Sequence, residues 1–162
     1  MSDAATRRLL REDYDVPLPA LLRIARRTYG RAIEVALQQD GIIDVPRNGM
    51  YVLGGIARTG CRHGEIVKEL ALSKQAASQL IDTLVERGYL LRSTDSLDRR
   101  RINLDLTEEG KMVAAISRSA VEAVDAELLA DVGAEYISIT KRTLAVLIDI
   151  NDKQHGLPRG KR

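Results

Sequence analysis

Between Lys74 and Gln79 the chain carries side chains that can form hydrogen bonds with the edges of base pairs. A glutamine amide can make a paired hydrogen bond to N6 and N7 of adenine, and small residues such as Ala76 and Ser78 allow close approach to a major-groove floor. Farther along the chain, three consecutive arginines occupy positions 99 to 101. A guanidinium is attracted to a narrow minor groove, where negative potential is concentrated. Together the two groups indicate chemistry directed at a nucleic-acid duplex.

The first group lies on a predicted helix that begins after Ser73 and ends at Gly88. The Ser73 hydroxyl can accept a hydrogen bond from an unpaired N–H of the first turn, and glycine readily takes the positive φ that closes helices. Apolar residues recur at spacings of three and four and therefore share the side that faces a core: Ala77, Leu80, Ile81, Leu84 and Val85.

The opposite side of this helix is polar and graded along its length. Its first half carries Lys74 and neutral polar residues, whereas Asp82 and Glu86 lie in the second half, where they would repel phosphates. A helix that meets DNA with its N-terminal end is expected to look like this, because the positive end of its dipole approaches first. Taken alone, the polar side is more typical of a solvated helix surface, and the neighbouring segments change that interpretation.

Residues 64–72 predict a short helix, joined by a tight turn to the longer one, which is the helix-turn-helix arrangement. Downstream, residues 101–106 alternate between apolar and polar side chains, a pattern typical of a half-buried strand. The segment that follows Tyr89 pairs with it as a two-strand ribbon whose tip carries the arginines. Thr107 caps the next helix, with Glu108 and Glu109 in its first turn as the dipole prefers.

These segments resemble the MarR family of winged helix-turn-helix regulators. The family signature is an Asp-Arg-Arg element on the wing, followed at fixed distance by Leu-Thr and then Gly; the matching residues are Asp98, Arg99, Arg100, Leu106, Thr107 and Gly110. The resemblance is sharp over residues 64–110 and elsewhere extends only to the pattern of helices.

The resemblance implies a mainly α fold, in which a winged helix-turn-helix domain with a two-strand β-wing is flanked by N- and C-terminal dimerisation helices. Residues 1–162 then form a single MarR-like domain, with residues 46–106 as the winged helix-turn-helix part. Residues 18–41 and 107–152 supply the dimerisation helices, and both segments are apolar on one face.

The resemblance also implies the DNA contacts. The helix lies in the major groove, with five candidate contacts at its first two turns: Ser73, Lys74, Gln75, Ser78 and Gln79. On the wing, Arg100 enters the minor groove, and Asp98 holds it by a charged hydrogen bond. Arg99 and Arg101 then contact phosphates or the aspartate. The alternative for this run is a charged hairpin that only keeps a strand edge soluble.

The function implied is sequence-specific binding to double-stranded DNA by a homodimer, with repression as the default outcome because a bound dimer excludes polymerase. Two heads related by a two-fold axis would meet half-sites about one helical turn apart, roughly 34 to 36 Å. The competing hypothesis is a winged-helix protein-interaction module that does not bind DNA. Such a module is expected to lack the arginine tip and the polar helix side.

Relatives of this kind bind small aromatic or phenolic effectors in a crevice between the dimerisation helices and the winged part. The candidates for such a crevice are Arg26, Arg27, Tyr29 and Tyr51, and the alternative is that they are interface or surface residues. The chain has one cysteine, Cys61. The nearby Arg58 and Arg62 would lower its pKa, which makes redox sensing an alternative, although a lone cytosolic thiol is usually incidental.

Composition narrows the remaining classes. The net charge of the 162 residues is only +2, so the basic charge is local, at the wing and near the N-terminus. No apolar run approaches the roughly 20 residues that cross a bilayer, and we expect a cytoplasmic protein without membrane contact. We expect no metal, no cofactor and no enzymatic activity, because spaced ligand sets, phosphate-binding glycine loops and nucleophile motifs are absent from the sequence.

Two further expectations concern glycines. Pro46 suits the first turn of a helix that runs to about Thr59, with Gly54 and Gly55 inside it. Each interior glycine costs a helix about 1 kcal/mol against alanine, which predicts that another helix packs closely there. Gly133 is expected to break the long helix that follows Thr107.

Overall fold

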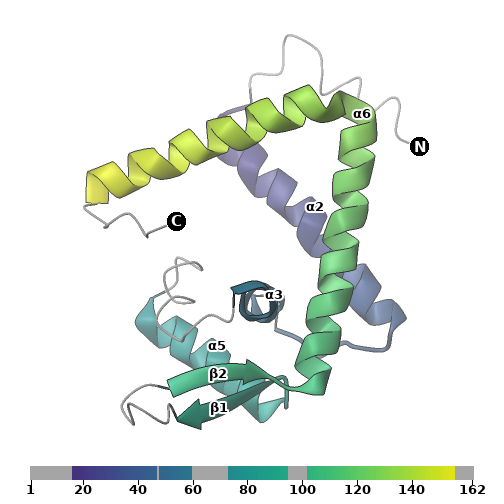
Figure 1. The fold of residues 1–162 in the computed structure, drawn as a ribbon, viewed down its shortest axis with the longest axis vertical. Coiled ribbons are helices and arrows are strands. Elements are labelled where there is room, and N and C mark those ends of the chain that lie inside the picture. Colours follow the sequence, from purple (N-terminus) through teal and green to yellow (C-terminus); the bar gives the residue numbers. More distant parts are fainter. Residues whose placement is uncertain (1–15, 47, 60–72, 95–101, 156–162) are drawn as a thin grey trace. The chain divides into compact units, whose positions relative to one another are not determined.

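The computed structural model of the chain describes residues 16–46, 48–59, 73–94 and 102–155. They form helices α2 (Leu18–Gln39), α3 (Gly49–Thr59), α5 (Lys74–Glu86) and α6 (Glu108–His155), and strands β1 (Leu90–Thr94) and β2 (Ile102–Leu106) (Figure 1). They divide into two units, Met1–Val121 and Glu122–Arg162. The predicted mainly α fold with a two-strand sheet is confirmed.

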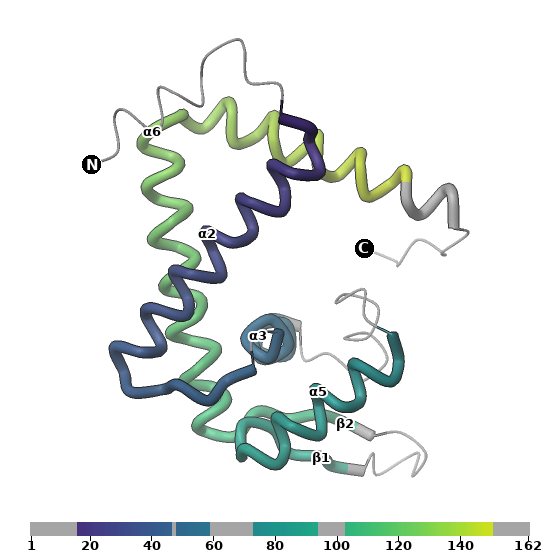
Figure 2. Tube along the Cα trace, turned by 180° about the vertical axis from the view of Figure 1, so that it is seen from behind, coloured from purple at the N-terminus to yellow at the C-terminus, as the bar shows by residue number. Residues whose placement is uncertain are grey.

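The first unit is organised around an aliphatic core to which each of its elements contributes. The side chains that are most completely buried are Leu53 of α3, Ile81 and Leu84 of α5, Leu90 of β1 and Val113 of α6. Burial of side chains of this size contributes about 1.5 to 3 kcal/mol each. The core therefore holds α5 and the wing against α3 and the first turns of α6. Figure 2 shows the course of these elements from behind.

Helix α2 enters this core only with its C-terminal half. Ile33 and Leu37 are buried, whereas Leu18 and Ile24 are 49% and 51% exposed. The helix ends at Gln39, close to the predicted end, and Gly41 just beyond it has φ of 74°. The amide N–H of Ile42 donates to the carbonyl of Leu37 at 2.9 Å, as in other glycine-terminated helices.

The expected start of α3 is wrong, and so is the expected close packing at Gly54; for Gly55 that packing stays a prediction. The helix begins at Gly49 rather than at Pro46, whose carbonyl instead accepts a hydrogen bond from the Gly49 amide in a preceding turn at 2.6 Å. A Cβ at Gly54 would meet nothing within 4 Å, so no close helix packing explains that glycine. The close approach falls at Gly49 itself, where a Cβ would lie 2.9 Å from Leu84.

The wing is a two-stranded antiparallel sheet with a regular ladder. Leu90 pairs with Leu106 and Arg92 with Leu104. Leu90 and Leu104 are buried, whereas Leu91 is 57% exposed and Asp105 is also exposed, so the predicted alternation is confirmed.

A compact junction joins the end of α5, the wing and the start of α6. The Thr107 hydroxyl donates to the carbonyl of Gly88 at 2.7 Å and accepts from the amide of Gly110 at 2.9 Å. Thr107 is therefore the predicted cap of α6, and it also binds the residue that ends α5. Gly110 packs directly on the backbone of Tyr89, because a Cβ there would overlap the Tyr89 carbonyl oxygen.

The second unit consists of the remainder of α6. Gly133 has φ of 81° and ψ of 164°, so the helical path is interrupted there, as predicted. Large apolar side chains are exposed along the unit on both sides of this glycine: Leu128, Leu129, Tyr136, Ile139, Val146, Leu147, Ile148 and Ile150. Exposed apolar side chains in this number are typical of interaction surfaces.

Among the described residues, no helix has the length and apolar character needed to cross a bilayer.

The junction yields the first prediction. Gly110→Ala should lower the free energy of unfolding by about 1 to 3 kcal/mol, because backbone must move to relieve the overlap. Urea denaturation at a fixed protein concentration measures the change. Gly54→Ala is the matched control, since the same substitution in open helical space should raise stability by about 0.5 to 1 kcal/mol. Equal effects of the two substitutions would contradict the close packing at Gly110.

Candidate nucleic-acid interface

The predicted contact helix, α5, is built as its sequence indicates. The Ser73 hydroxyl accepts a hydrogen bond from the Ala76 amide at 3.2 Å, which caps the N-terminus. Ala77, Ile81 and Leu84 are buried, and Leu80 and Val85 are partly buried against the core. The apolar side of the helix therefore faces inward.

The polar side of α5 is presented outward at its N-terminal end. Lys74, Gln75 and Gln79 are exposed, as is Ser73, and Ser78 is half-buried. These are the five helix residues predicted as DNA contacts, and they lie together on the first two turns. Amides with free access to solvent can exchange their water for the edges of bases.

The C-terminal end of α5 is fixed by backbone hydrogen bonds. Gly88 has φ of 77°, as the predicted stop requires, and its amide donates to Val85 at 3.0 Å. The amide of Tyr89 donates to Leu84 at 2.9 Å. This pair of bonds is the Schellman motif, which satisfies carbonyls that the last turn leaves open.

Two side chains that follow α5 bind the segment between α2 and α3. The Arg87 guanidinium donates to the backbone carbonyl of Asp44, and the Tyr89 hydroxyl donates to the Asp44 carboxylate. Burial, followed by the hydrogen bond to Asp44 and its negative charge, raises the pKa of Tyr89 to about 12. The sequence analysis missed this clamp, because nothing local links residues more than 40 positions apart.

A second contact missed from the sequence, an ion pair, joins α5 to the wing. The Arg92 guanidinium of β1 donates to the Asp82 carboxylate of α5, and both side chains are partly exposed. The predicted wing contacts Asp98, Arg99, Arg100 and Arg101 lie outside the described residues, as do residues 64–72, the predicted first helix of the pair. Cys61 lies outside them too, and its redox role stays a prediction.

The predicted effector residues fall partly on one cavity of the first unit. A pocket of about 420 Å³ between α2 and α3 is lined by Arg23, Arg26, Arg27, Gly30, Asn48, Met50 and Tyr51. The Arg26 guanidinium lies 5.0 Å from the centre of the Tyr51 ring, a cation–π contact. Tyr29, the fourth predicted residue, is not among those that line it.

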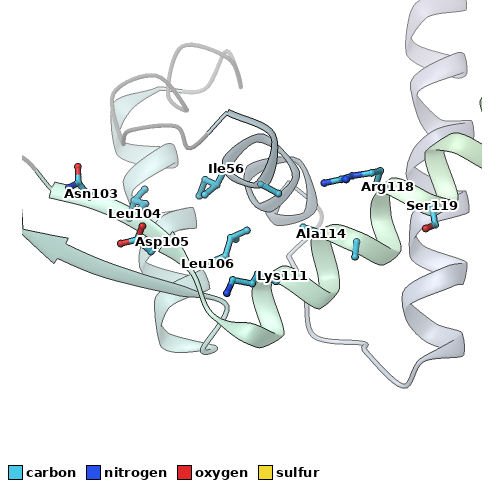
Figure 3. A pocket seen from close by; sticks show the side chains of 11 residues that line it. Ile56, Asn103, Leu104, Asp105, Leu106, Lys111, Ala114, Arg118 and Ser119 are labelled. Atoms are coloured by element: carbon cyan, nitrogen blue, oxygen red, sulfur yellow. The ribbon is translucent and has the colours of Figure 1, made fainter.

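A second cavity of about 790 Å³ lies between α3, β2 and the first turns of α6 (Figure 3). Its lining includes Lys111 and Arg118, but also the carboxylate-bearing Asp105, and Lys111 is already paired with Glu108 at 2.6 Å. The charges in this cavity therefore do not favour one sign of ligand. Within the described part of the chain, no three potential metal ligands gather into a cluster.

An amphipathic helix, capped and exposed at its N-terminal end and followed by a two-strand wing, defines a winged helix-turn-helix protein. Residues 43–101 match the family model described as MarR family. The match overlaps the segment whose wing signature resembles the same family.

One curated relative is a protein of Bacillus subtilis (strain 168) named "Uncharacterized HTH-type transcriptional regulator YwhA". It is 35% identical to this chain over 75 residues, which are 43% of this chain and 54% of the relative. The chain thus matches about half the length of that protein.

Solved structures share the fold. Streptococcus pneumoniae FabT in complex with DNA has a TM-score of 0.70 at 19% identity, covering 85% of this chain and 96% of FabT. The S. aureus MepR–DNA complex has a TM-score of 0.67 at 20% identity, covering 82% of this chain and 95% of MepR. At these identities the likeness concerns the fold.

The clamp at Asp44 yields a prediction about pH. The neutral Tyr89 phenol is favoured in the folded state, so its contribution to stability is complete below pH 10 and is lost as pH rises through about 12. Tyr89→Phe should lower the free energy of unfolding by about 0.5 to 1.5 kcal/mol near pH 8, and the difference from the parent should shrink between pH 10 and 12.

Denaturant unfolding of both proteins across this pH range measures the difference, and absorbance titration of the folded proteins checks its origin. The tyrosine that ionises last should disappear from the titration in Tyr89→Phe. A difference in stability that stays constant up to pH 12 would show that the phenol proton is not involved.

Proposed function

We propose that the protein is a sequence-specific transcriptional regulator that binds double-stranded DNA as a homodimer. The observation that carries the proposal is the exposure of Lys74, Gln75 and Gln79 at the capped, N-terminal end of α5. In this position amide side chains and the positive end of the helix dipole reach a major groove together. At this end of α5, the residues that contact DNA are Ser73, Lys74, Gln75, Ser78 and Gln79.

The wing supplies the second contact in this proposal. Arg100 enters the minor groove with Asp98 as its hydrogen-bond partner, and Arg99 and Arg101 neutralise phosphates. Support comes from the signature that these residues share with the MarR family and from the ladder of β1 and β2, which leads to their segment. FabT and MepR, which share the fold, have been solved in complexes with DNA.

The exposed apolar surfaces support a homodimer. Leu18, Leu21 and Ile24 lie on the N-terminal half of α2, outside the core of the first unit, and the second unit exposes further large apolar side chains. Apolar surfaces of this extent are normally covered by a partner. A dimer presents two copies of α5 to the half-sites of a pseudo-palindromic operator, and bound there it excludes polymerase and represses transcription. The protein then works in the cytoplasm, where the chromosome lies.

The proposal also includes release by a small effector. The pocket between α2 and α3 is lined by Arg23, Arg26 and Arg27, and no acidic side chain is among the described residues that line it. Its volume of about 420 Å³ suits a small molecule. A small aromatic acid would pair its charge with these guanidiniums and its ring with Tyr51.

Selection of bound duplexes from a random library, followed by anisotropy measurements, tests the function itself. Affinity for the selected duplex should exceed that for random duplex by at least about 1,000-fold and should fall steeply as salt rises. Binding that is independent of salt, or no enrichment of any sequence, would favour the protein-interaction module.

The contact helix yields a specific prediction. Gln79→Ala should weaken binding to the selected duplex by about 1 to 3 kcal/mol and relax the choice of base at one or two positions. Gln38→Ala, which removes an exposed glutamine from the last turn of α2, is the matched control and should leave binding unchanged. Equal losses on selected and random duplex for Gln79→Ala would mean that this side chain reads no base.

The pocket between α2 and α3 yields a prediction about the effector. Benzoate and a panel of hydroxybenzoates should include compounds that lower affinity for the selected duplex, with a coupling of about 1 to 3 kcal/mol. Arg26→Gln should abolish the response without changing DNA affinity in the absence of compound. Arg31→Gln is the control, because Arg31 is exposed on the same helix and does not line the pocket. A response that survives Arg26→Gln would place the effector elsewhere.

A further inference from the structure

Arg92 is an exception to the alternation of inward apolar and outward polar side chains along the strands of the wing. In the ladder of β1 and β2 it pairs with Leu104, and residues directly opposite each other share a face of the sheet. Leu104 and the adjacent inward residue Leu90 are 4% and 0% exposed. Arg92 is therefore a cation at a position of the inner face where the pattern calls for an apolar side chain, on the strand that packs against α5.

The position of Arg92 is explained by its partner on α5. Its guanidinium forms a hydrogen-bonded ion pair with Asp82, with side chains that are 39% and 48% exposed. Ion pairs with this much access to water contribute little to stability. This pair nevertheless restricts the position of the wing relative to α5. In the proposed function both of these elements contact DNA.

Asp82 also lies close to the predicted base contacts. It follows Gln79 by three positions and Ser78 by four, so the three side chains are neighbours on one side of the helix. A carboxylate in this position that had no cationic partner would repel the phosphate backbone. Arg92 balances that charge and at the same time ties it to the wing.

We propose that Asp82 and Arg92 are positioning residues that brace the wing against the recognition helix and so fix the spacing between the major-groove and minor-groove contacts. The inference rests on the proposed DNA binding. In the brace, the negative charge of Asp82 favours specific binding, because the ion pair holds the outer part of β1 in one position relative to α5, beyond the anchor that buried Leu90 provides. Simple repulsion predicts the reverse, namely that removal of the carboxylate strengthens binding.

This difference in sign is the basis of the test. Affinities are measured on the selected duplex and on random duplex for Asp82→Asn, Arg92→Gln, the single exchanges Asp82→Arg and Arg92→Asp, and the exchanged pair that combines the last two. Asp82→Asn and Arg92→Gln should each lose about tenfold in affinity for the selected duplex and less than about twofold for random duplex, where backbone contacts dominate. The exchanged pair should recover a larger ratio of selected to random affinity than Asp82→Arg or Arg92→Asp alone.

Glu86→Gln is the matched control, since it removes the same charge from the next turn of α5. It should bind the selected duplex as tightly as the parent or more tightly. Thermal unfolding of the free variants should stay close to that of the parent, which separates misplacement of the wing from loss of fold.

Two results overturn the brace. Asp82→Asn that binds the selected duplex as tightly as the parent, or more tightly, shows that the carboxylate acts only by repulsion. If the exchanged pair has no larger ratio of selected to random affinity than the single exchanges, the two residues do not act through each other. Failure of the parent itself to prefer any duplex would instead refute the proposed function and the brace with it.

Discussion

The contact between Gly110 and the carbonyl oxygen of Tyr89 is the constraint on which the rest of the first unit depends. It leaves no room for a side chain, so the first turn of α6 lies directly on the backbone that connects α5 to β1. The Thr107 hydroxyl secures the same contact by bonding both to Gly88 and to the amide of Gly110. The end of α5, the wing and the start of α6 therefore form one joint.

From this joint the remaining interactions orient α5. The core holds Ile81 and Leu84, and the clamp at Asp44 fixes Arg87 and Tyr89 just beyond the helix. With its apolar side and its C-terminal end both held, the helix keeps its N-terminal polar side exposed. In the proposed function this fixed presentation lowers the entropy that ordering would otherwise cost on binding.

Sequence reasoning found the features whose signals are local. The Ser73 cap, the Gly88 stop, the Thr107 cap and the break at Gly133 each follow from the conformational preference of one residue and its near neighbours. The sides of α5 followed from periodicity. Within the candidate site, exposure of the predicted glutamines could be anticipated in the same way, since an amphipathic helix has to turn its polar side outward.

The features that were missed depend on contacts between distant residues. Nothing in the sequence indicates that Asp44 binds Tyr89 or that Arg92 binds Asp82. The glycines show the same limit, because Gly54 was expected to make a close contact and Gly110 makes it. Which glycine lies against another backbone is decided by the fold, not by the helix in which it stands.

Hydroxyl-radical footprinting on a selected duplex tests most directly whether two copies of α5 and two wings engage DNA together. Two protected stretches should appear, related by a two-fold axis and centred about 34 to 36 Å apart, each flanked by protection of an adjacent minor groove. A single protected stretch, or protection without two-fold symmetry, would contradict a dimer that reads two half-sites.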